Sequence, residues 1–282
     1  MSKKLIVGAS GNVGKWVVEN LNNDEIVAAE RNIDKFKEAD IETRKLDFYD
    51  PKTFENIFEN IDSIFLMRPP AISKVKEYIF PFIDKALEKG VKKIVFLSLI
   101  GAENNNLVPH KKVEDYLIKR NADYTFIRPT FFMQNLTGMH LQDINELGEI
   151  IAPVGKGKTN FIDAKNIGEI IAKTLKETGH EKKAYSITGP KSYTYHKIAE
   201  ILSKKLDRKI EFNEPGIIKF FIRMKKRGFD INYIFVMTAI FLTSKFGKAD
   251  ITNDNFEKIM GYKPDSIESF VDRNKDKFLK IN

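Results

Sequence analysis

Residues 4–14 read KLIVGASGNVG, and this stretch decides the fold. The apolar run predicts a β-strand over Lys4–Gly8, and the residues after the turn predict an amphipathic helix over Val13–Asn22. Between them lie three glycines in the pattern G-x-x-G-x-x-G, at Gly8, Gly11 and Gly14. A strand, a glycine turn and a helix in this order are typical of a fold that binds a dinucleotide.

The glycines of this turn have separate roles. Gly8 permits a tight turn out of the strand, Gly11 lets the backbone approach a pyrophosphate, and Gly14 allows the helix to pack closely on the strand. The helix N-terminus offers free N–H donors to the anion. The candidate cofactor-binding residues of the turn are Gly8, Ser10, Gly11, Asn12, Val13 and Gly14.

Outward from this turn, short β-branched runs alternate with amphipathic stretches up to about residue 150. Strands are expected at 25–29, 42–46, 63–67, 93–98 and 124–128, and helices at 51–61, 80–88 and 111–120. The alternation predicts an α/β fold, with a Rossmann-type doubly wound parallel sheet and a smaller C-terminal α/β substrate lobe. We assign residues 1–150 to the NAD(P)-binding domain, completed by 162–189, and residues 190–282 to the smaller substrate or lid lobe.

The C-terminal half contains a predicted helix at 164–176, a strand at 184–188 and a helix at 195–206. Residues 213–247 are rich in Phe, Ile and Met and predict short helices with a broad apolar face. Two interpretations are compatible with one another. In the first, the segment forms the core of the C-terminal lobe, and in the second it forms a lid that closes over an apolar ligand.

Composition excludes several classes of protein. The chain has no cysteine, which excludes disulfides, thiolate metal sites and cysteine nucleophiles, and no metal is expected. The N-terminus shows no signal-peptide pattern, and no apolar run approaches the length of a membrane span, so we expect a cytoplasmic protein without a membrane partner. The net charge is +8, but lysines and acids are interleaved, and nucleic-acid binding is therefore not expected.

The residues that follow the second predicted strand indicate which dinucleotide is bound. Arg31 is suited to pair with a 2′-phosphate, which favours NADP (NADPH) over NAD. The neighbouring Glu30 leaves two alternatives, because it either turns outward or supports NAD. Asp47, with the adjoining Phe48, stands where such folds contact adenine, and Asp47 is equally suited to a turn or helix cap.

With these residues in place, the chain resembles the NmrA-like branch of the atypical short-chain dehydrogenases/reductases. The glycine turn and the Arg31-Asn32 step carry part of the resemblance. The rest lies in VEDYLIKRNADYTFIRPTFFMQNL at 113–136 and in GYKPDSIESFVDRNKDKF at 261–278. That branch includes NADPH-dependent quinone oxidoreductases, triphenylmethane dye reductases, isoflavone-reductase relatives and NADP(H)-sensing regulators.

The resemblance implies further site residues. It places Met67, Arg68 and Pro69 along the middle of the cofactor, and Pro129, Thr130 and Phe131 around the nicotinamide. It also implies a substrate wall formed by Phe131, Phe132 and Met133.

The usual proton relay of short-chain dehydrogenases is missing. Ser98 ends the fifth strand where that relay has its serine, but no Tyr-x-x-x-Lys follows at the expected distance. Tyr116 and Arg120 have the spacing but lie too far along the helix. Close relatives have a lysine three residues before the Val-Glu step, and His110 stands there in this chain. His110 and Ser98 are the candidate catalytic residues, and His110 is equally suited to a surface loop.

This pattern leaves two functions open. The first is an NADPH-dependent oxidoreductase that transfers hydride to a quinone-like or conjugated small molecule, since such acceptors need no proton delivered by the protein. The second is a non-catalytic NADP(H) sensor that binds a protein partner. We expect a monomer or a homodimer.

Overall fold

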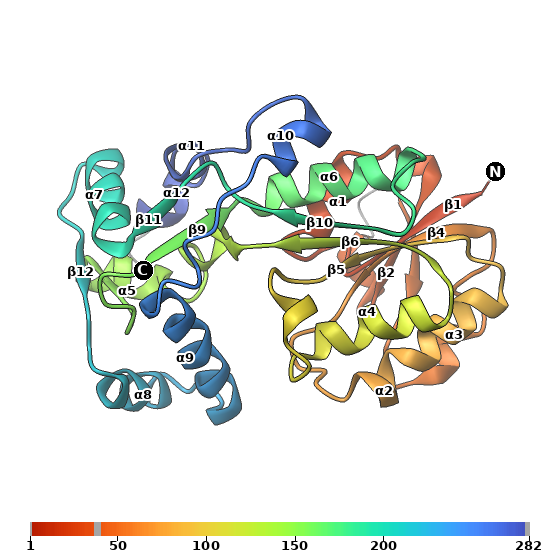
Figure 1. Ribbon diagram of the computed structural model, residues 1–282, viewed down its shortest axis with the longest axis horizontal. Coiled ribbons are helices and arrows are strands. Elements are labelled where there is room, and N and C mark those ends of the chain that lie inside the picture. Colours follow the sequence, from red (N-terminus) through yellow and green to blue (C-terminus); the bar gives the residue numbers. More distant parts are fainter. Residues whose placement is uncertain (1, 37–40, 280–282) are drawn as a thin grey trace. The chain divides into compact units, whose positions relative to one another are not determined.

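The computed structural model describes residues 2–36 and 41–279 and divides the chain into two compact units (Figure 1). The first unit consists of Met1–Pro129 with Ala164–Ile187, and the second consists of Thr130–Asp163 with Thr188–Asn282. The chain therefore leaves the first unit after Pro129, returns at Ala164 and leaves again after Ile187. The role of residues 190–282 as a substrate lobe stays a prediction.

A seven-stranded parallel sheet forms the centre of the first unit, in the order β10-β6-β5-β4-β1-β2-β3. Its strands are β1 (Lys3–Val7), β2 (Ile26–Glu30), β3 (Glu42–Lys45), β4 (Ile61–Met67), β5 (Lys93–Leu97), β6 (Asp123–Pro129) and β10 (Lys183–Ile187). The order reverses between β1 and β4, and ligands of open α/β sheets bind beyond the strand ends at such a switch point. The predicted Rossmann-type sheet is confirmed.

Helices cover both faces of this sheet (Figure 1). On one face lie α1 (Gly14–Glu19) and α6 (Ala164–Lys176), and on the other lie α3 (Phe80–Glu88) and α4 (Pro109–Lys119), with the short α2 (Val75–Tyr78) before α3. Close packing of α1 on α6 depends on Gly168, because a Cβ atom there would lie 2.3 Å from the Cβ of Trp16.

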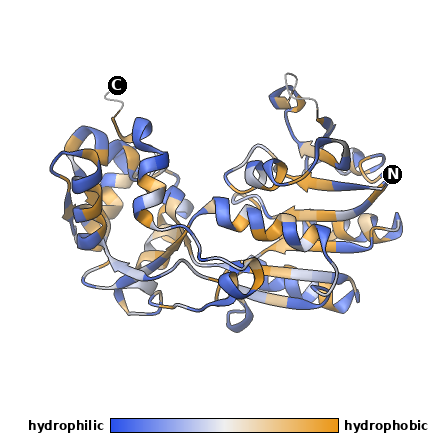
Figure 2. Cartoon of the chain, turned by 90° about the horizontal axis from the view of Figure 1, so that it is seen from above, coloured by the Kyte–Doolittle hydropathy of each residue, from blue (hydrophilic) through white to orange (hydrophobic). Residues whose placement is uncertain are grey.

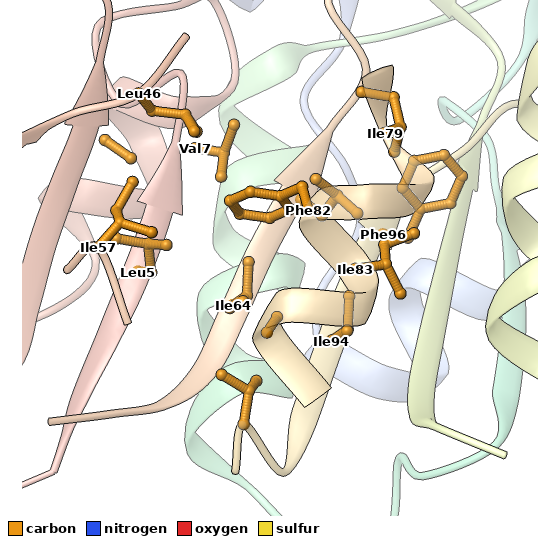
Figure 3. Close-up of a cluster of buried hydrophobic side chains, with 14 of the residues drawn as sticks. Leu5, Val7, Leu46, Ile57, Ile64, Ile79, Phe82, Ile83, Ile94 and Phe96 are labelled. Atoms are coloured by element: carbon orange, nitrogen blue, oxygen red, sulfur yellow. The ribbon is translucent and has the colours of Figure 1, made fainter. Parts of the chain in front are cut away.

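The core of the first unit explains why its central strands β1, β4 and β5 are apolar over most of their length. Leu5, Ile64 and Ile94 of three neighbouring strands pack against Phe82 and Ile83 of α3 (Figure 3). Strands that are covered on both faces have no solvent side and therefore carry no alternating polar residues. Figure 2 shows the result, with largely hydrophobic strands beside helices in which hydrophilic and hydrophobic residues alternate.

The helix predicted over residues 51–61 is wrong. The structure has only a short 3-10 helix, η3 (Pro51–Phe54), followed by turns that end in the left-handed backbone of Asn60, with φ of 57°. The hydroxyl of Thr53 donates to the carbonyl of Asp50 at 2.7 Å, and local bonds of this kind compete with helix formation. Phe54, Ile57 and Phe58 are nevertheless buried. The apolar spacing predicted the burial of these side chains correctly and the local structure incorrectly.

The second unit holds two small sheets, seven α-helices and one 3-10 helix in its described residues. The sheets are β11 (Ser192–Thr194), β9 (Lys158–Ile162) and β7 (Phe131–Phe132), and β12 (Glu211–Asn213) with β8 (Glu149–Ile151). The helices are α5 (Leu141–Leu147), α7 (Tyr195–Leu206), α8 (Ile217–Lys226), α9 (Ile231–Lys245), α10 (Asn255–Met260), α11 (Ile267–Arg273) and α12 (Lys275–Leu279). Within residues 2–36 and 41–279, the remaining 3-10 helices are η1 (Asn23–Glu25), η2 (Ile33–Phe36), η4 (Ala102–Asn104) and η5 (Met133–Asn135).

The short helices predicted over 213–247 are confirmed as α8 and α9. Their inner faces supply core residues of the second unit, including Phe220, Ile234 and Phe241. Arg223 and Arg227 of this segment also bind the buried carboxylate of Asp143 in α5, at 2.5 and 2.9 Å. Throughout the described ranges, no helix combines the length and the hydrophobicity that crossing a membrane requires.

Candidate functional site

The glycine turn lies at the carboxyl end of β1 and fits an anion. Gly8 has φ of 69°, in the left-handed region that favours glycine, and its carbonyl accepts from the N–H of Gly11 at 2.9 Å. A Cβ atom on Gly14 would lie 2.1 Å from the same carbonyl, so only glycine fits there. In the part of the chain that the structure describes, the N–H groups of Asn12, Val13 and Gly14 have no protein acceptor. They remain available to a phosphate.

Glu30, at the end of β2, is directed into this turn. Its carboxylate is buried, with 8% of the residue exposed, and it accepts a hydrogen bond from the N–H of Ser10 at 2.6 Å. Its other oxygen lies 3.7 Å from Nζ of Lys35. Of the two alternatives left by the sequence, the outward orientation is therefore wrong. The carboxylate is held by groups of the protein in this structure.

Lys35 is a site residue that the sequence analysis missed. Its Nζ donates to Oγ of Ser10 at 2.9 Å, and its side chain is exposed, as is that of Arg31. Two exposed cations therefore follow the second strand, after which folds of this type recognise the ribose 2′ position of a dinucleotide. The available signal was the spacing Arg31-x-x-x-Lys35 directly after the strand.

Asp47 and Phe48 follow β3. The carboxylate of Asp47 accepts from the N–H of Tyr49 at 3.0 Å, which is a turn contact. The ring of Phe48 lies in the core, with its centre 5.2 Å from that of Phe82. Only the main chain of Phe48 is therefore placed to contact a ligand.

Met67 and Arg68 stand at the end of β4, next to β1. The Sδ atom of Met67 lies against the turn, since a Cβ atom on Gly8 would be 2.6 Å from it. The guanidinium of Arg68 donates to three carbonyls of the loop 69–72 at 2.7–3.0 Å, and burial lowers its pKa from the ordinary value. Arg68 thereby shapes the loop that contains Pro69.

Three buried polar atoms at this sheet edge have no protein partner among the described residues. They are Nε of Arg68, Oγ of Ser98 and Nδ1 of His110. Arg68 and Ser98 directly follow the paired residues Met67 and Leu97 of neighbouring strands. Buried polar atoms are costly when they form no hydrogen bond, so this edge is suited to receive polar groups of a ligand.

The electrostatics of His110 limit its chemistry. Burial lowers the pKa of His110 to about 3, and the nearby positive charge of Arg68 contributes. The imidazole is therefore neutral near pH 7. In that form it can accept or donate a hydrogen bond, but it holds no imidazolium proton to give to a substrate.

Tyr116 and Arg120, which have the spacing of the dehydrogenase proton relay, form contacts away from the sheet edge. The hydroxyl of Tyr116 donates to the carboxylate of Asp84 at 2.7 Å, and Arg120 lies 3.2 Å from the same carboxylate. Both side chains therefore belong to the contact between α3 and α4. They do not join Ser98 and His110 at the sheet edge.

Four of the remaining predicted residues belong to the second unit. Pro129 ends β6 in the first unit, whereas Thr130, Phe131, Phe132 and Met133 are in the second. Thr130 donates to the side-chain carbonyl of Asn160 at 2.8 Å, and Met133 is fully buried in the core. Phe131 and Phe132 are partly exposed, so their rings retain surface for a ligand.

The chain is similar to several known proteins. Residues 1–278 match the profile of the NmrA-like family. The prestalk A differentiation protein A of Dictyostelium discoideum is 29% identical over 276 residues, which cover 95% of this chain and 90% of that protein. The NAD(P)H azoreductase of Xenophilus azovorans is 30% identical over 217 residues, which cover 74% of this chain and 75% of that protein.

A solved structure shows the same fold. The NADPH-dependent quinone oxidoreductase of Escherichia coli, complexed with NADPH, superposes with a TM-score of 0.86 at 21% identity. The match covers 96% of this chain and 99% of that one.

Proposed function

The chain belongs to the NmrA-like family, and from this premise we propose that it is an NADPH-dependent oxidoreductase acting on a quinone or a similar flat, conjugated acceptor. The azoreductase and quinone oxidoreductase similar to this chain support the general reaction class. The acceptor is proposed from the chemistry of the site.

The observation that carries the proposal is the set of unpartnered polar atoms at the sheet edge. Arg68 Nε, Ser98 Oγ and His110 Nδ1 lie at the carboxyl edge, where the strand order reverses next to the glycine turn. A dinucleotide that extends from the turn along this edge would offer them phosphate, ribose and amide groups. The main-chain N–H groups of residues 12–14 would hold the pyrophosphate, and Arg31 and Lys35 the 2′-phosphate.

The reaction follows from what these residues can and cannot do. When bound, a reduced nicotinamide supplies a hydride. The residues of the chain would bind and orient the cofactor and the acceptor without supplying a proton. His110 is neutral, and the hydroxyl of Tyr116 is bound to Asp84. Neither His110 nor Tyr116 is therefore arranged to deliver a proton together with the hydride. Conjugated acceptors suit such a site, since their reduced form is stabilised and takes its proton from water.

A turnover assay tests this proposal. We expect the purified protein to oxidise NADPH in the presence of a quinone, an azo dye or a triphenylmethane dye, and to leave aliphatic ketones unreduced. His110→Gln retains a neutral hydrogen-bonding group and should keep much of the activity. Failure of every conjugated acceptor, while NADPH still raises the melting temperature, would exclude this oxidoreductase.

That failure would favour the second candidate, an NADP(H) sensor. Two observations support it. Tyr116 and Arg120 contact Asp84 and not the sheet edge. One similar protein is the prestalk A differentiation protein A of Dictyostelium discoideum. A sensor should capture a protein partner differently with NADPH and with NADP. Equal capture in both states and without nucleotide would count against sensing.

A further inference from the structure

Helices α8 and α9 of the second unit expose large apolar side chains to solvent. Ile218 of α8 is 76% exposed, and Phe235 and Val236 of α9 are 61% and 57% exposed. Ile222 and Ile240 are also exposed. Single exposed apolar residues need no explanation, but a group of this size on neighbouring helices indicates an interaction surface.

The sequence of α9 shows that its exposed side is apolar by composition. Residues 231–244 contain no charged residue. Ile234, Met237 and Phe241 occupy the buried face, and Phe235, Val236 and Ile240 lie outside it. A surface helix normally carries charged residues on its solvent side, and a helix that is apolar on every side is normally covered.

Aromatic contacts link α8, α9 and the connection between them beside these exposed residues. The ring of Phe221 in α8 lies 5.4 Å from that of Phe235 in α9, centre to centre. Phe229, in the connection between the helices, stacks on Tyr233 with a separation of 5.5 Å. We call the exposed residues of 217–246 the α8–α9 face (helices labelled in Figure 1).

Helix α8 also carries exposed lysines beside these apolar side chains. Residues 215–248 contain seven Lys and Arg residues and one acid, Asp230. Arg223 and Arg227 are bound to Asp143, but Lys219, Lys225 and Lys226 are exposed and form no ion pair within the described ranges. Helical spacing places Lys225 on the side of α8 that carries Ile218 and Ile222. The face therefore combines apolar side chains with unpaired positive charge.

We propose that the α8–α9 face docks on an anionic lipid bilayer. Exposed aromatic and aliphatic side chains would enter the boundary between headgroups and acyl chains, and the lysines would contact anionic headgroups. A second copy of the chain fits less well, since a two-fold contact would bring the same lysines of both copies together. The earlier expectation of no membrane partner rested on the absence of a spanning segment, and surface docking needs none.

Vesicle flotation of the full chain tests this proposal without nucleotide or acceptor, so its outcome does not depend on the oxidoreductase activity. At low salt, we expect the protein to float with vesicles that contain about one third phosphatidylglycerol and not with pure phosphatidylcholine. The triple variant K219E/K225E/K226E should lower the partition on the order of 100-fold. Phe235→Ser should lower it by a smaller factor and leave the salt dependence intact.

The matched control is K89E/K92E/K119E, which makes the same change of charge at exposed positions of the first unit. It should keep most of the binding. Equal flotation with both vesicle types, or equal losses in both triple variants, would overturn the proposal. So would the absence of flotation together with a concentration-dependent dimer that Phe235→Asp converts to a monomer, because a second copy would then cover the face.

Discussion

Among the described residues, buried polar atoms at the carboxyl edge of the first unit have no protein partner, whereas large apolar side chains on the α8–α9 face of the second unit are exposed. The first arrangement is built for a ligand that supplies hydrogen bonds in a confined place. The second is suited to a partner with a broad apolar and anionic surface. The unpartnered polar atoms and the exposed apolar side chains therefore indicate two different kinds of ligand.

The largest expected effect comes from a substitution in the glycine turn of the first unit. Gly14→Ala should destabilise the protein by about 1–3 kcal/mol and lower NADPH affinity by about 100-fold or more. The reason is that the added Cβ would lie 2.1 Å from the Gly8 carbonyl and must displace the turn. Chemical denaturation and calorimetry measure the two effects.

The matched control for this change is Gly216→Ala. Gly216 is the N-cap residue of α8, with φ of −58°, and a Cβ atom there meets nothing within 4 Å. This variant should leave NADPH affinity intact and lower stability by no more than about 1 kcal/mol, because alanine is a poorer N-cap than glycine. Similar losses in both variants would show that the glycine turn has no special part in binding.

A smaller effect concerns buried histidines. Because the folded pKa of His110 is about 3, below the ordinary 6.5, the unfolded chain takes up a proton between these values while the folded chain does not. Stability should therefore fall as the pH drops below 6.5, by up to about 1.4 kcal/mol per pH unit from this residue. His140, whose pKa burial lowers to about 4, adds a similar dependence.

Thermal unfolding between pH 7.5 and pH 5 measures this dependence. His110→Gln should lose less stability on acidification than the wild type, while His196→Gln, at an exposed position, serves as the control. A wild-type slope identical to that of His110→Gln would contradict the burial of a neutral imidazole.

Much of the first unit could be predicted because its signals are local. Continuous apolar runs give strands that are covered on both faces, and the spacing of Gly8, Gly11 and Gly14 specifies a turn that has little freedom. The prediction of a helix over residues 51–61 failed because the same apolar spacing also occurs where side chains are buried without a helix. Thr53 there bonds to nearby carbonyls instead of allowing a regular helix.

The details of the site could not be predicted because they depend on contacts between distant residues. Glu30 is turned inward by the N–H of Ser10 and by Lys35, and no pattern around Glu30 contains that information. The neutral state of His110, in α4, depends on its burial near Arg68, which follows β4 and is distant in the sequence. The exposed side of α9 was equally hidden, since its sequence alone is that of a core helix.

Calorimetric titration with NADPH and NADH tests the central claim most directly, namely that the carboxyl edge of the first unit binds NADPH. The wild type should bind NADPH at least about tenfold more tightly than NADH, and the double variant R31A/K35A should lose that preference while still binding NADH. Equal affinities in the wild type, or a preference for NADH, would contradict the account. Glu30 would then be the residue that reads a free 2′-hydroxyl.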